Sequence, residues 1–128
     1  MKYVIIGNST AALYAVEGIR SVDKKGKITI VSDEKHPAYG RPLISYYLYG
    51  KTDLEHSAYR PADFYEKMGV DLILGERAVK IEPKEKRVLL QSGKKAGYDK
   101  LLVATGSRPF VPPMEGLDKV EKKFTFMT

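Results

Sequence analysis

The residues most suggestive of chemistry form a short loop, GNSTAA at residues 7–12, between an apolar run and a helical pattern. In a dinucleotide-binding turn, one glycine permits a sharp bend, a second leaves room for a pyrophosphate, and a third small residue lets the helix pack closely. Gly7 and Ala12 meet the first and third demands. Ser9 replaces the second glycine, but its hydroxyl can donate to an anion beside the free amides of a helix N-terminus. The alternative is that Ser9 or Thr10 is a plain helix N-cap.

Two acids, Asp33 and Glu34, follow the next apolar run. A carboxylate at the end of the second strand of a dinucleotide-binding fold accepts hydrogen bonds from ribose hydroxyls. Acids after a strand are also common loop residues. Together with the glycine loop, however, they favour nucleotide binding.

Regular elements must hold these groups in place. The run KYVIIG at 2–7 predicts a strand buried on both faces of a parallel sheet. Apolar residues then recur at helical spacing over 9–22, where Glu17 and Arg20 are expected to face water. A second strand follows at 27–34. This strand, tight turn, helix and strand form the opening of a dinucleotide-binding fold.

The remaining pattern predicts an α/β fold with a mostly parallel sheet and a small antiparallel β-meander. Its expected elements are a polar loop at 35–42, short helices at 43–50 and 61–69, a strand at 70–75, the meander from 76, and a buried strand at 100–106.

Composition limits the function classes. The 128 residues suffice for one domain or part of one, and the absence of cysteine excludes disulfides, thiolate metal sites and cysteine redox chemistry. The net charge of +6 comes from short basic clusters interleaved with acids, so nucleic-acid binding is not expected.

There is no signal-peptide pattern and no apolar run near the roughly 20 residues that cross a bilayer. We expect a cytoplasmic protein without membrane association.

Histidines and tyrosines offer weaker candidates. His36 and His56 are isolated from any ligand-like spacing, so no metal site is expected and the DLEH segment is interpreted as a solvated loop. Tyr46, Tyr47 and Tyr49 lie at helical spacing beside leucine and isoleucine, which favours core or partner contacts.

Three segments in order, VIIGNSTAA, AYGRPLIS and YDKLLVATGSRP, resemble the FAD-binding domain of the pyridine nucleotide-disulfide oxidoreductase superfamily. The similarity is nearest to the NADH:rubredoxin reductase, ferredoxin reductase and nitrite-reductase-like flavoproteins, and it runs from residue 1 to about residue 113. The resemblance implies a Rossmann-like FAD/NAD(P)-binding domain with FAD as cofactor and NAD(P)H as co-substrate.

The resemblance also implies particular contacts with FAD. Those to the pyrophosphate fall on Gly7, Ser9, Thr10, Ala11 and Ala12, and those to the adenosine ribose on Glu34 and Asp33. Those on the flavin side fall on Arg41 and Pro42, and those to the adenine edge on Ala78 and Val79. The signature of the last parallel strand falls on Ala104, Thr105, Gly106 and Arg108.

Two departures from the family pattern stand out. Tyr46 occupies the place where many ferredoxin-reductase-like relatives have a lysine close to the reactive flavin nitrogen, and the RPLISYY segment lacks the redox cysteine of the disulfide-reducing branches. The flavin carries the redox chemistry in such proteins, so no catalytic side chain is assigned. As an alternative to core or partner contacts, Tyr46, Tyr47 and Tyr49 would form part of a wall beside the flavin.

The resemblance implies a discontinuous domain, with its first half at 1–110 and a connection at 111–128 toward an NAD(P)H-binding domain. The first hypothesis is the FAD-binding portion of an NAD(P)H-dependent oxidoreductase that passes electrons to an acceptor such as a small redox protein. This chain alone is then expected to be inactive and to bind FAD weakly or not at all. The second is a free-standing, non-catalytic nucleotide-binding module or subunit.

Overall fold

The computed structural model describes residues 1–125. Its elements in chain order are β1 (Lys2–Ile6), α1 (Thr10–Val22), β2 (Lys27–Ser32), η1 (Arg41–Leu43), α2 (Ile44–Leu48), α3 (Phe64–Lys67), β3 (Val70–Leu74), β4 (Ala78–Glu82), β5 (Arg87–Leu90), β6 (Lys95–Gly97), β7 (Lys100–Val103) and η2 (Leu117–Lys119).

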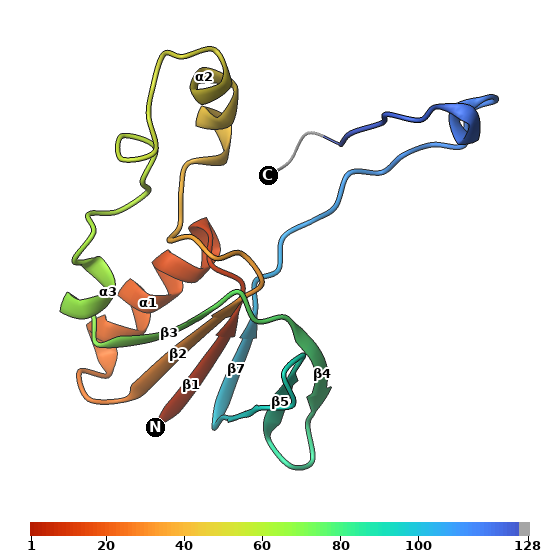
Figure 1. Ribbon diagram of the computed structural model, residues 1–128. Helices are drawn as coiled ribbons and strands as arrows, with labels where there is room; N and C mark the ends of the chain where they lie inside the picture. Colours follow the sequence, from red (N-terminus) through yellow and green to blue (C-terminus); the bar gives the residue numbers. More distant parts are fainter. Residues whose placement is uncertain (126–128) are drawn as a thin grey trace.

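Two sheets build the body. The first is parallel with strand order β3-β2-β1-β7, and the second is antiparallel with order β4-β5-β6. The arrowheads of β1, β2 and β7 point to the same end of the molecule (Figure 1). The predicted combination of a parallel sheet and a small antiparallel meander is confirmed.

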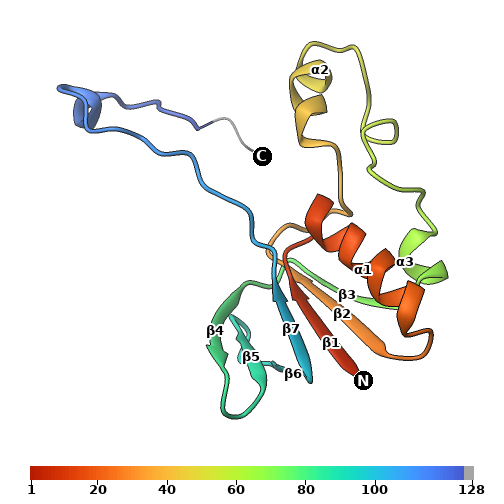
Figure 2. The ribbon, with the colours of Figure 1, turned by 180° about the vertical axis from the view of Figure 1, so that it is seen from behind.

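Each face of the parallel sheet is covered by a different layer. On one face α1 and α3 bury an apolar cluster that includes Leu13, Ile30 and Phe64. On the other, the antiparallel sheet contributes Val88 and Leu90 to a second cluster. Figures 1 and 2 show α1 and α3 on one side of the sheet and β4 and β5 on the other. Burial on both faces explains why β1 is a nearly unbroken apolar run.

The strand predicted as buried at 100–106 differs from expectation. Strand β7 ends at Val103 and lies at the edge of the sheet, where it pairs with β1 on one side. Leu102 and Val103 are therefore 38% and 54% exposed. The prediction of burial is wrong for the part of the chain that the structure describes, because no further strand of that part covers the outer edge of β7.

For the tyrosine-rich helix, core or partner contacts are predicted, and the structure rules out the core. Helix α2 has no buried residue, and Tyr46, Tyr47 and Tyr49 are 51%, 44% and 77% exposed. Figure 1 shows the reason: α2 lies away from the parallel sheet. Contact of these side chains with a partner or with the flavin stays a prediction.

Arg20 was expected to face water, but it is a structural residue. Its guanidinium donates to the carbonyl oxygens of Met68 at 2.6 Å and Gly69 at 3.0 Å, after α3. It also donates to those of Gly26 at 2.8 Å and Asp23 at 3.1 Å, before β2. The Arg20 side chain therefore joins the end of α1 to the turn before β2 and to the turn after α3. These bonds hold α1 and α3 together on one face of the parallel sheet.

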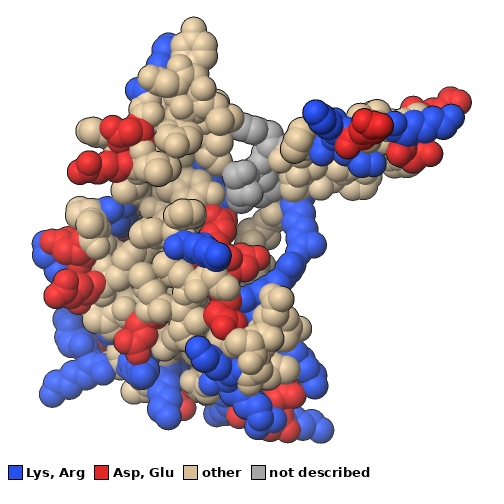
Figure 3. All heavy atoms as spheres, in the orientation of Figure 1, with Lys and Arg blue, Asp and Glu red and all other residues tan. Residues whose placement is uncertain are grey.

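Beyond β7 the chain has little regular structure. After Pro109, η2 is the one helical turn in the part described, and Figure 1 shows this segment extending away from the sheets. The domain boundary near residue 110 stays a prediction. Within residues 1–125 there is no helix with the length and apolar character that crossing a bilayer requires. On the face in Figure 3, basic and acidic side chains are interspersed over several elements.

Candidate functional site

A cleft of about 810 Å³ lies at the carboxyl ends of the parallel strands. Strands β1 and β7 are neighbours there, while the chain runs from β1 to β2 on the opposite side. Such a reversal of strand order is where open α/β sheets bind ligands. The lining comprises residues 6–9, 32–34, 41, 77, 78, 104–109 and 125.

Most of the residues singled out from the sequence meet at this cleft. Those in its lining are Gly7, Ser9, Asp33, Glu34, Arg41, Ala78, Ala104, Thr105, Gly106 and Arg108. Those outside it are Thr10, Ala11, Ala12, Pro42 and Val79. Among the latter, Ala12 is fully buried on the face of α1 that packs on the sheet, where a small residue allows the close packing argued from the sequence.

Gly7 allows the ends of three strands to converge. Its φ of +110° is a conformation that residues with a side chain rarely adopt. A Cβ at this position would overlap the carbonyl oxygen of Ala104 and lie 2.7 Å from its carbonyl carbon. The Gly7 amide donates to the Val31 carbonyl at 2.8 Å, and the Ala104 amide donates to the Ile6 carbonyl at 2.8 Å. The glycine is therefore required by packing against β7 as well as by the turn.

Ser9 stands at the N-cap position of α1, but its side chain makes no capping hydrogen bond. The plain N-cap alternative for the Ser9 hydroxyl is therefore not what the structure contains. No acidic residue lies in the first turn of α1 either. The positive end of the helix dipole is left facing the cleft without a carboxylate of its own turn, which suits an anion.

Glu34 and Arg41 were assigned to opposite parts of a ligand, but they form an ion pair of 2.6 Å. The Arg41 guanidinium also lies 5.5 Å from the centre of the Tyr39 ring. Burial raises the pKa of the Tyr39 phenol, and its hydrogen bond to Glu34 and the charge of that carboxylate act in the same direction. The Glu34 carboxylate, just after β2, thus already accepts hydrogen bonds from Arg41 and Tyr39.

A buried polar chain joins the glycine loop to the segment before Arg41. Tyr65 of α3 donates its hydroxyl to Asn8 Oδ1 at 2.9 Å and accepts a hydrogen bond from the Ala38 amide at 3.1 Å. Asn8 Nδ2 is the one buried side-chain polar atom of residues 1–125 that lacks a partner. An unsatisfied buried donor costs about 1–3 kcal/mol. Sequence reasoning missed Asn8 and Tyr65 because their contact depends on the tertiary fold.

Arginines give the cleft its charge. Arg41, Arg77 and Arg108 line it together with two acids, Asp33 and Glu34. Arg77 was not singled out from the sequence, because its position directly before β4 carries no local signal. The turn before it is bonded to the end of β2, since the Glu76 amide donates to the Ser32 carbonyl at 2.9 Å. This excess of cations favours an anionic ligand.

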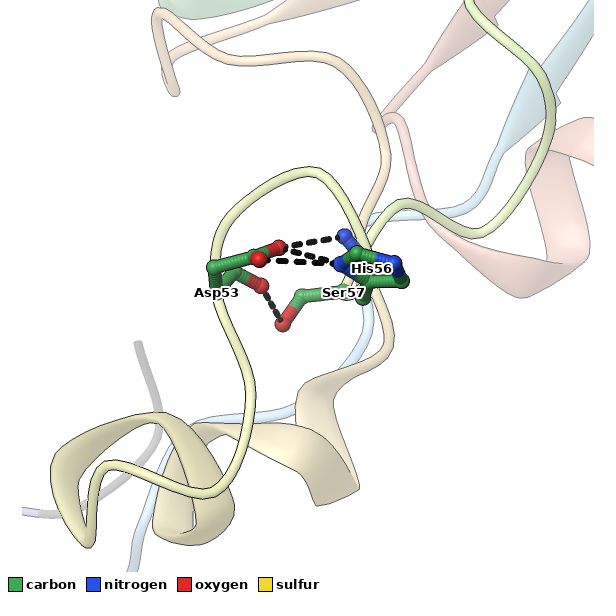
Figure 4. Close-up of polar contacts among 3 residues, drawn as sticks. All are labelled: Asp53, His56 and Ser57. Carbon is green, nitrogen blue, oxygen red and sulfur yellow. Dashed lines mark hydrogen bonds and ion pairs between the residues drawn. The ribbon is translucent and has the colours of Figure 1, made fainter.

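The turn at 53–57 supports the segment that carries Arg41. In Figure 4 the Asp53 carboxylate faces the His56 ring, with its Oδ1 2.8 Å from Nδ1, while the Ser57 hydroxyl donates to the Asp53 carbonyl at 2.6 Å. The Ser57 carbonyl in turn accepts from the Gly40 amide at 2.8 Å. Because Ser57 bonds to the backbone rather than to His56, these three residues are not a hydrolytic triad.

We expect Asp53→Asn to lower the pKa of His56 toward the ordinary value of 6.5, because the hydrogen bond and charge of Asp53 raise it. A histidine with a raised pKa in the folded state stabilises the fold below its unfolded pKa, and this contribution is lost as pH rises through the folded pKa. The measurement is an NMR titration of the His56 Hε1 resonance, assigned with a His36→Gln variant. An unchanged His56 pKa in Asp53→Asn is the contrary result.

Comparison with known proteins gives consistent matches. The family model described as "Pyridine nucleotide-disulphide oxidoreductase" matches residues 1–128. The chain is 38% identical over 117 residues to nitrite reductase [NAD(P)H] of Bacillus subtilis (strain 168), covering 91% of this chain and 14% of the relative. It is 37% identical over 117 residues to rhodocoxin reductase of Rhodococcus erythropolis, covering 91% of this chain and 27% of the relative.

A solved structure has the same fold. In the covalent putidaredoxin reductase–putidaredoxin complex, the matching chain is 31% identical with a TM-score of 0.78, over 88% of this chain and 27% of that chain. The present chain therefore spans less than a third of the length of each of these proteins.

Proposed function

Because the chain belongs to the pyridine nucleotide-disulphide oxidoreductase family, we propose that it forms the FAD-binding portion of an NAD(P)H-dependent flavoprotein oxidoreductase. Members of this family depend on FAD and use NAD(P)H. The observation that carries the proposal is the cleft at the carboxyl ends of β1, β2 and β7, where the Gly7 turn, the Glu34 carboxylate and the 104–106 turn meet.

The residues of the cleft suit the adenosine diphosphate half of FAD. The turn at Gly7 and Ser9 and the amides at the start of α1 would hold the pyrophosphate, since the Ser9 side chain does not cap these amides and the first turn has no acidic residue. Glu34 would accept a ribose hydroxyl, and Ala78 would meet the adenine edge through its backbone. The unpartnered Nδ2 of Asn8 adds a buried donor beside the same turn.

When bound, FAD supplies the exchange of electrons between the nicotinamide and the acceptor. This chain would bind and orient it, and no side chain is proposed as a catalytic acid or base. We further propose an acceptor such as a small redox protein, because one of the similar structures is a reductase joined to its redox protein. An intracellular, cytoplasmic location is part of the same proposal.

Titration of the 128-residue chain with FAD, ADP and riboflavin tests this function. FAD and ADP are expected to bind weakly, and riboflavin more weakly still, because the cleft residues serve the adenosine and pyrophosphate rather than the flavin ring. Flavin fluorescence reports FAD and riboflavin, and calorimetry reports ADP. A folded chain that binds neither FAD nor ADP would contradict the proposal.

Two glutamate variants make a matched pair for this titration. Glu34→Gln and Glu17→Gln each remove one partner of a glutamate–arginine ion pair, and the two pairs are similarly exposed. Glu34 lies in the cleft, whereas Glu17 of α1 pairs with Arg60 outside it. Glu34→Gln is expected to weaken FAD and ADP binding by about threefold to tenfold, the size of one ordinary net hydrogen bond. Glu17→Gln is expected to leave both affinities unchanged.

A further inference from the structure

The turn that carries Glu34 begins with a buried serine. Strand β2 is apolar at Ile28, Ile30 and Val31, but its last residue is Ser32, which is 7% exposed. A hydroxyl withdrawn from water in this way costs free energy unless it makes a hydrogen bond. The Ser32 Oγ accepts one from the Glu34 amide at 3.2 Å. A serine oxygen bonded to the amide two residues ahead favours a turn, so the chain bends at the end of β2.

Backbone bonds tie the same segment to the turn before β4. The Ser32 carbonyl accepts from the Glu76 amide at 2.9 Å, and the Glu34 carbonyl accepts from the Gly75 amide at 3.1 Å. These two bonds fix carbonyl groups, whereas within residues 1–125 the Glu34 amide is bonded by the Ser32 hydroxyl alone. The hydroxyl therefore sets the orientation of the peptide between Asp33 and Glu34, and with it the direction in which the Glu34 side chain leaves the backbone.

This orientation matters because Arg41 of η1 attracts the same side chain. The Glu34 Oε1 lies 2.6 Å from Nη2 of Arg41, and Ser32, Glu34 and Arg41 all line the cleft. A loosely held backbone would let Glu34 follow Arg41. With the peptide fixed by Ser32, the carboxylate stays at the cleft while its partner changes from Arg41 to a ligand hydroxyl.

We propose that Ser32 is a positioning residue for ribose recognition: its hydroxyl fixes the peptide that carries Glu34, so that the carboxylate accepts a ribose hydroxyl of the bound nucleotide. The inference rests on the proposed function and extends it to a residue that acts through Glu34. It also gives the cleft a selectivity, because a nucleotide without ribose hydroxyls gains nothing from Glu34 or from Ser32.

Ser32→Ala tests the positioning role with two ligands, ADP and dideoxy-ADP, which keeps the adenine and pyrophosphate but lacks both ribose hydroxyls. Calorimetry is expected to show ADP affinity lowered by about threefold to fivefold, the size of one net hydrogen bond. The affinity for dideoxy-ADP is expected to change by less than about twofold, because that ligand has no hydroxyl for Glu34. Partial unfolding would weaken both ligands by the same factor, so the ratio of the two affinities reports the placement of Glu34.

A double-mutant cycle with Glu34→Ala separates an effect through Glu34 from a direct one. Glu34→Ala removes the acceptor, so Ser32→Ala in this background is expected to change ADP affinity by less than about twofold. Ser57→Ala is the matched control: Ser57 is 6% exposed, and its hydroxyl donates to the Asp53 carbonyl at 2.6 Å in a turn outside the cleft. This change is expected to leave the ratio of ADP to dideoxy-ADP affinities unaltered.

The outcomes separate this inference from the proposed function. The inference is overturned if Ser32→Ala, confirmed as folded by circular dichroism, leaves ADP affinity unchanged or weakens ADP and dideoxy-ADP equally. It is also overturned if Ser32→Ala costs the same factor with and without Glu34. Equal binding of ADP and dideoxy-ADP to the unmodified chain would remove the ribose contact, and the inference with it, while nucleotide binding stands. If the unmodified, folded chain binds neither ADP nor FAD, the proposed function itself fails.

Discussion

Replacing Gly7 with alanine is expected to lower the free energy of unfolding by about 3 kcal/mol or more, the sum of a strained positive φ and an overpacked contact. The new methyl group would overlap the Ala104 carbonyl, and the Ala104 amide is bonded to the Ile6 carbonyl at 2.8 Å, so relieving the overlap requires β1 and the end of β7 to move apart. Urea unfolding followed by circular dichroism measures the loss. ADP binding is expected to fall as well, because the same turn lines the cleft.

Gly18→Ala is the matched control for this change. Gly18 lies within α1, and a Cβ there would meet no atom within 4 Å. Replacing a helical glycine with alanine ordinarily stabilises a protein by about 0.5–1 kcal/mol. Opposite signs for the two glycine variants are therefore expected, and a Gly7→Ala protein as stable as the original would show that β7 does not approach this turn closely.

Leu13→Ala is expected to cost about 3 kcal/mol of unfolding free energy, within the range measured for large-to-small substitutions in packed cores. Leu13 is 0% exposed and belongs to the cluster between α1 and the parallel sheet. Its removal leaves a cavity beneath the helix whose N-cap residue, Ser9, lines the cleft. Urea unfolding again provides the measurement.

Leu48→Ala removes the same side chain from an exposed site. Leu48 of α2 is 69% exposed, so its truncation is expected to change the unfolding free energy by less than about 0.5 kcal/mol. A loss of unfolding free energy in Leu48→Ala comparable with that in Leu13→Ala would mean that α2 packs against the sheets instead of lying away from them.

Local pattern was enough to predict the elements near the N-terminus. The apolar run before Gly7 and the helical spacing after it are set by residues close in sequence, and both the fold class and the family resemblance are confirmed. Glu34 could be placed at the cleft because strand ends in a parallel sheet share one edge. The assignment of individual residues to parts of FAD stays a prediction.

Contacts between distant residues could not be predicted in this way. The bond from Tyr65 to Asn8 joins α3 to the glycine loop, and the four carbonyl contacts of Arg20 join turns that are far apart in sequence. The apolar pattern also fails to predict burial where no other element of the described residues packs on a side chain. Tyr46 on α2 and Leu102 on β7 are residue types common in cores, but periodicity alone does not say what lies against them.

The ion pair between Glu34 and Arg41 has a consequence for how a ligand enters. Each residue already has an oppositely charged partner at 2.6 Å, so a ribose or a phosphate that engages either one competes with a contact present in the free protein. Binding at this end of the cleft is therefore an exchange of partners. The net gain in free energy at this end of the cleft is the difference between two similar interactions, so its contribution to affinity is modest. In return, the two charged side chains are already held in place before the ligand arrives.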